Sequence, residues 1–94
     1  MNAEETIAPL TLLEQALGVI GISSRVDELA VWPRLRVYGS SDTPSAEFDN
    51  SVVVIEHRRQ MWFAWPWAEP IARAGQVTRA AAIIADLVSN RGIR

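Results

Sequence analysis

The segment from Met61 to Trp67, Met-Trp-Phe-Ala-Trp-Pro-Trp, contains three of the four tryptophans and one of the two phenylalanines of the chain. Aromatic residues favour the pleated, half-buried positions of a strand. Pro66 has no N–H to give to a sheet, so we expect a strand from Gln60 to about Trp65. Side chains alternate across a strand. The two predicted faces carry Met61, Phe63, Trp65 and Trp67 on one side, and Trp62, Ala64 and Pro66 on the other.

A second strand is predicted immediately before it, over residues 51–57, because Val52 to Ile55 are all β-branched. Arg58-Arg59 joins the two strands, and arginine is unsuited to the positive φ of a two-residue hairpin loop. We therefore expect a wider four-residue turn from His57 to Gln60. The predicted cross-strand pairs are Glu56 with Met61, Val54 with Phe63 and Val52 with Trp65.

Both faces of this hairpin are apolar, because Val53, Ile55, Trp62 and Ala64 form the face opposite Phe63. An antiparallel sheet with one face in water should alternate apolar and polar residues. Both faces of the hairpin are therefore expected to be covered, either within the chain or by a partner.

The 94 residues are sufficient for one domain, expected over 1–94 with a flexible polar lead at 1–5 and a flexible tail at 91–94. Cysteine is absent, which excludes disulfides and thiolate metal sites. The start of the chain is acidic and no apolar run has membrane length, so we expect a cytoplasmic protein without membrane contact. All nine basic residues are arginine, which is typical of a GC-rich genome.

The remaining elements follow from periodicity and from turn residues. A helix is expected at 6–17, with Thr6 as its cap, Pro9 in its first turn and Gly18 after its last turn. The other predicted segments are strands at 22–29 and 34–38, a loop at 39–50, a connector at 68–75 and a helix at 76–90.

The predicted fold class is α+β in the order α-β-β-β-β-α, with an antiparallel sheet of about three to four strands and two helices packed on one face. We expect both helices to cover the side that carries Phe63 and Trp65. The opposite face, with Val53, Ile55 and Trp62, is then left without a helix. Large exposed apolar patches usually mark interaction sites.

The sequence contains no recognisable catalytic, cofactor or metal motif. His57 is the single histidine, and it lacks Cys or paired carboxylates at ligand spacing. The serine pairs at 23–24 and 40–41 lack a nucleophile-elbow context. We therefore predict a non-enzymatic protein without a cofactor.

The segments 22–37, Trp62 to Ile71 (Trp-Phe-x-Trp-x-Trp-x-Glu-Pro-Ile) and the alanine-rich 80–87 resemble a group of small uncharacterised actinobacterial proteins. This resemblance covers most of the chain from Leu12 onward; it implies a GC-rich bacterial source and no particular activity. A looser similarity is to double-stranded-RNA-binding domains, built α-β-β-β-α. Their basic cluster at the start of the last helix is missing here, with Arg73 and Arg79 as the nearest substitutes, and the first predicted strand is extra.

Three functions remain open. The preferred one is an interaction module that forms a homodimer or docks a protein partner, with a predicted site at Val53, Ile55, Arg58, Arg59 and Trp62. The second, less favoured because the net charge is −2, is a nucleic-acid-binding module using Arg25, Arg34, Arg36, Arg58 and Arg59. The third is a small-ligand carrier with an aromatic pocket formed by Trp62, Trp65 and Trp67.

Overall fold

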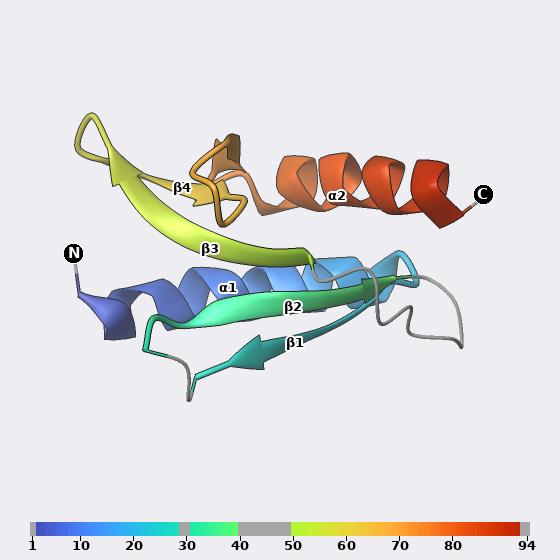
Figure 1. Cartoon of the computed structure of the whole chain (residues 1–94), viewed down its shortest axis with the longest axis horizontal. Helices are drawn as coiled ribbons and strands as arrows, with labels where there is room; N and C mark the ends of the chain where they lie inside the picture. Colours follow the sequence, from blue (N-terminus) through green and yellow to red (C-terminus); the bar gives the residue numbers. More distant parts are fainter. Residues whose placement is uncertain (1, 29–30, 40–49, 93–94) are drawn as a thin grey trace.

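Seven elements follow one another in the computed structural model, which describes residues 2–28, 31–39 and 50–92 (Figure 1). They are α1 (Ala3–Val19), β1 (Ser23–Asp27), β2 (Arg34–Gly39), β3 (Asn50–His57), β4 (Gln60–Ala64), β5 (Pro70–Arg73) and α2 (Val77–Gly92). The predicted α+β class, with an antiparallel sheet and a helix at each end of the chain, is confirmed. The fifth strand, β5, was not predicted, because its residues fall in the expected connector. Residues 40–49 of the predicted loop lie outside the described residues.

Helix α1 begins three residues before the predicted start at Thr6. The side chain of Asn2 accepts a hydrogen bond from the Glu5 N–H at 3.0 Å, and the Glu5 carboxylate accepts one from the Asn2 N–H at 3.3 Å. This reciprocal pair is a capping box, and it satisfies two donors that would otherwise lack partners. Residues 3–5, expected as a flexible lead, are therefore helical, and Pro9 lies in the second turn rather than the first.

The end of α1 also differs from the prediction, because Gly18 is still helical. The left-handed position is Gly21, with φ of 85°. The Gly21 N–H donates to the Gly18 carbonyl at 3.1 Å and the Ile22 N–H donates to the Leu17 carbonyl at 2.9 Å. These two bonds make a Schellman motif, in which Ile22 and Leu17 both join the core.

The five antiparallel strands lie in the order β1-β2-β3-β4-β5. Strand β3 is shared between two partners along its length: residues 50–52 pair with β2, and residues 53–57 pair with β4. The predicted pairs of Val54 with Phe63 and Glu56 with Met61 are confirmed. The predicted pair of Val52 with Trp65 is absent from the described ladder, because β4 ends at Ala64. On the opposite edge of β3, Val52 lies opposite Leu35 of β2.

The β3–β4 hairpin closes through two residues and not through the wider turn predicted. His57 pairs directly with Gln60, and Arg58 and Arg59 have φ of 52° and 64°. Two consecutive positive φ values are characteristic of a type I′ turn, whose twist matches that of the flanking strands. The prediction failed because it weighted the side-chain preference of arginine above the geometry that a tight hairpin requires.

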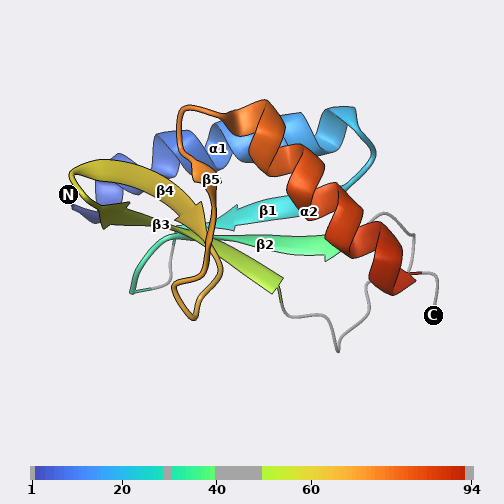
Figure 2. The same cartoon turned by 90° about the horizontal axis from the view of Figure 1, so that it is seen from above.

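Both helices pack on the Phe63 side of the sheet, as predicted, and α2 runs at an angle to α1 (Figure 2). They share one apolar cluster with the sheet. Its buried members are Leu10, Leu13, Leu17, Ile22, Leu35, Val37, Val52, Val54, Phe63, Trp65, Ala72, Ala80, Ala81, Ile84 and Val88. Leu87 of α2 is 36% exposed and does not belong to this cluster. No helix within the described ranges is long and apolar enough to cross a membrane.

Candidate interaction surface

The sheet face opposite the two helices, here called the outer face, carries the predicted site. The register places Ile55, Trp62 and Arg73 in one row across β3, β4 and β5, and places Val53 beside Ala64 in the next. Because Val54 and Phe63 belong to the core, their neighbours along the strands must point the other way. The outer face is therefore a row of apolar side chains that ends in an arginine.

Burial on the outer face is graded, although no helix covers it. Ala64 is fully buried, whereas Val53, Ile55 and Trp62 are half-buried. Neighbouring strands supply this partial cover: the Arg73 guanidinium lies over the Trp62 ring, 5.5 Å from its centroid. Such a cation–π contact holds both side chains in place. The surface is thus a shallow, ordered platform and not a wide exposed apolar patch.

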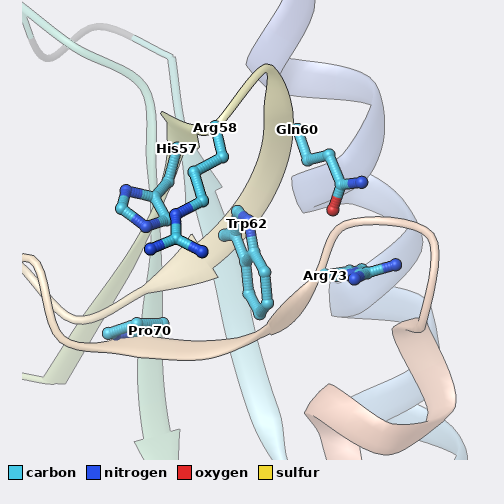
Figure 3. A pocket seen from close by; sticks show the side chains of 6 residues that line it. All are labelled: His57, Arg58, Gln60, Trp62, Pro70 and Arg73. Atoms are coloured by element: carbon cyan, nitrogen blue, oxygen red, sulfur yellow. The ribbon is translucent and has the colours of Figure 1, made fainter.

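A hollow of about 540 Å³ opens at the edge of this platform, and we call it the Trp62 hollow. Its lining residues are His57, Arg58, Gln60, Trp62, Pro70 and Arg73. The Trp62 indole lies between the side chains of Arg58 and Arg73 (Figure 3). A second hollow, of about 400 Å³, continues past Trp62 and Arg73 to Gln76 and Arg79, just before and within α2.

The arginines of the two halves of the sheet differ in their partners. On β2, Arg36 and Arg34 lie 3.6 and 4.0 Å from the same carboxylate oxygen of Asp27. Around the Trp62 hollow, neither Arg58 nor Arg73 forms a salt bridge with any carboxylate in the described part of the chain. No aspartate or glutamate lines this hollow. It is therefore a locally cationic site in a chain of net charge −2.

The structure brings four of the five predicted site residues together. Val53, Ile55 and Trp62 share the outer face, and Arg58 reaches the hollow beside Trp62. Arg59 is exposed in the same turn and does not line the hollow. Arg73 was missed, because only the unpredicted strand β5 places it opposite Trp62. Arginine at the end of a Pro-Ile-Ala-Arg segment was the available signal, but that segment is too short to predict a strand.

The other aromatic residues of the initial segment have different surroundings. Trp65 is 7% exposed and belongs to the core, as predicted, whereas Trp67 is 64% exposed. Their rings stack with centroids 5.9 Å apart, and the Trp67 indole N–H donates to the Glu69 carboxylate at 2.8 Å. Trp62 takes no part in this stacking, so the three tryptophans do not form one cage.

His57 is exposed at the rim of the hollow, whose lining includes Arg58 and no carboxylate. Within residues 2–28, 31–39 and 50–92, no group of three His, Asp or Glu side chains is placed to hold a metal ion. The hollow presents a flat aromatic surface, guanidinium donors and the amide of Gln60. Comparison with family models, curated protein sequences and solved structures gave no match.

Proposed function

We propose that this chain is a non-enzymatic interaction module of the cytoplasm that docks a protein partner on its outer face. The central contact is the apolar row of Val53, Ile55 and Trp62, and Arg58 and Arg73 form its cationic rim. Tryptophan and arginine are enriched among the residues that contribute most to protein–protein binding. An apolar centre with a charged rim is also the usual anatomy of an interface.

One observation carries the proposal: both helices pack on the same face of the sheet. An apolar outer face is not needed to hold those helices, and an antiparallel sheet with one wet face ordinarily places polar side chains there. Ile55 and Trp62 instead occupy neighbouring positions on the face that has no helix. A docked partner would cover these two apolar side chains.

Nucleic-acid binding is the second candidate, and the arrangement of the arginines favours it less. The ion pairs of Arg34 and Arg36 with Asp27 partly neutralise two of the five arginines on which it depends. Phosphate binding by the remaining ones would fall steeply with salt. A gel shift with duplex RNA at low salt separates this candidate from protein binding.

The proposal is tested by affinity capture with the purified chain as bait, together with sedimentation velocity. Ile55→Thr keeps a β-branched side chain on the strand while removing apolar surface, and Trp62→Ala removes the centre of the platform. We expect one partner, or self-association, to be present with the wild type and to be lost with both variants.

Leu12→Ala is the matched control, because Leu12 is 53% exposed on α1, away from the outer face. This variant should retain whatever the wild type binds. A chain that sediments as a monomer, and that captures the same proteins with and without Ile55→Thr, would contradict the proposed function.

A further inference from the structure

We infer that the partner docked on the outer face presents an acidic segment, whose carboxylates bind Arg58 and Arg73 on the two sides of Trp62 in the Trp62 hollow. This inference rests on the proposed function and adds the chemistry of the partner. Three features of the molecule support it: the placement of the two guanidinium groups, the absence of a carboxylate around them, and the mismatch with a second copy of the chain.

The two guanidinium groups approach the hollow from different elements. Arg58 comes from the β3–β4 turn, and Arg73 comes from the end of β5. Figure 3 shows them on opposite sides of the Trp62 indole. Arg73 lies 5.5 Å from the ring centroid, and an arginine in contact with an aromatic face still has N–H groups at its edge. Those donors match the two oxygens of a carboxylate.

The hollow lacks a counter-ion of its own. Its lining holds two arginines and a histidine and no carboxylate, and the adjoining hollow adds Arg79. Glu56, the nearest acidic residue in the sequence of the hairpin, lies opposite Met61 on the other face. Cationic side chains that have no carboxylate among their neighbours attract an anion from outside the chain.

A second copy of this chain does not supply that anion in a symmetric arrangement. A two-fold interface places the same patch on both subunits. Docking hollow against hollow would bring Arg58 and Arg73 towards the same residues of the other copy. A partner with alternating acidic and apolar side chains fits better, because its apolar side chains would lie on Val53 and Ile55 while a carboxylate enters the hollow.

The probe is a short fluorescein-labelled peptide in which glutamate alternates with leucine, and binding is followed by fluorescence anisotropy. The reference peptide has glutamine in place of every glutamate. We expect the glutamate peptide to bind at least about tenfold more tightly, because hydrogen bonds to charged groups contribute more than neutral ones. Equal binding of the two peptides would overturn the inference.

Two variants of the same turn separate local recognition from overall charge. Arg58→Asn and Arg59→Gly each remove one arginine and each suit a positive φ, but Arg58 lines the hollow and Arg59 does not. We expect Arg58→Asn to weaken peptide binding about tenfold and Arg59→Gly to change it less than about twofold. Arg73→Gln should resemble Arg58→Asn. Equal losses for Arg58→Asn and Arg59→Gly would show attraction by net charge alone and overturn the inference.

Two further results would overturn the inference in favour of another occupant. One is a duplex RNA that displaces the peptide and loses affinity on Arg58→Asn; the other is a wild-type dimer that the peptide does not dissociate. The inference also fails separately from the proposed function: if Ile55→Thr abolishes capture of a partner while the glutamate peptide does not bind, the outer face is an interface without acidic recognition.

Discussion

At the scale of single residues, the turn of the β3–β4 hairpin carries the clearest conformational strain. Arg58 and Arg59 both occupy the left-handed region of backbone conformation. There, a residue with a Cβ raises the free energy of the folded state by roughly 1–2 kcal/mol. Asparagine followed by glycine is the usual solution for a type I′ turn. Residues held in sparsely populated backbone regions cluster at functional sites. The strain at Arg58 is therefore consistent with the proposal that this residue binds a partner.

The double variant Arg58→Asn, Arg59→Gly should therefore be more stable than the wild type by about 1 kcal/mol, because glycine removes the Cβ at position 59 and asparagine tolerates a positive φ better than arginine does. Urea unfolding followed by circular dichroism measures the change in the free energy of unfolding. Arg79→Gln is the control for loss of a surface charge, and its stability should stay within about 0.5 kcal/mol of the wild type. A double variant less stable than the wild type would mean that the arginine side chains stabilise the turn.

At the scale of elements, adjacent residues of β3 belong to different environments. Val54 is fully buried beneath the helices, and Val53 is half-buried on the outer face. Threonine has the shape of valine but adds a hydroxyl, which costs about 1–3 kcal/mol when it is buried without a hydrogen-bond partner.

Val54→Thr should therefore lower the free energy of unfolding by about 1–3 kcal/mol, whereas Val53→Thr should change it by less than about 0.5 kcal/mol. The two variants are matched controls for each other, because they lie on one strand and make the same substitution. Chemical denaturation of both proteins measures the difference. Equal losses would show that the two faces of β3 are equally covered, which contradicts an open outer face.

The sequence predicted the elements with strong periodicity, and it failed where several segments act together. The stripe of α1 and the pairing of Val54 with Phe63 depend on local pattern, and both are found. The start of α1 was missed because Asn2 and Glu5 were considered as an acidic lead and not as a capping box. Strand β5 holds four residues, and it exists because β4 and α2 lie beside it.

In the candidate site, too, the features set by local sequence pattern were predicted and those set by tertiary pairing were not. Alternation along β3 and β4 was enough to place Val53, Ile55 and Trp62 on one face. The contact between Arg73 and Trp62 was beyond that argument, since it needs a strand whose position is set by tertiary pairing. A contact at the β1 edge of the sheet was also beyond sequence reasoning, because it joins residues of two separate elements. There, Glu14 of α1 accepts a hydrogen bond from the Val26 N–H of β1 at 3.2 Å. A carboxylate in that place blocks addition of another strand there.

At the scale of the whole molecule, a single core holds together a sheet that divides along β3. The β1–β2 half and the β4–β5 half join through the two ends of one strand. The helices cross this junction on the inner face, where Leu13 of α1, Ile84 of α2 and Phe63 of β4 belong to the same cluster. All elements therefore contribute to one core, and no part of the described structure has a hydrophobic core of its own.

Unfolding should accordingly be one cooperative transition, in which the helical circular dichroism signal and tryptophan fluorescence change together. Phe63→Ala should lower the free energy of unfolding by about 3–5 kcal/mol, because it removes a fully buried ring at the centre of this cluster. That loss is a large share of the roughly 5–15 kcal/mol by which small domains are stable. Trp67→Ala, at an exposed aromatic residue, is the control and should cost far less. If the helical signal of Phe63→Ala outlasted the fluorescence change, the helices would have a source of stability apart from the sheet, and the single shared core would be disproved.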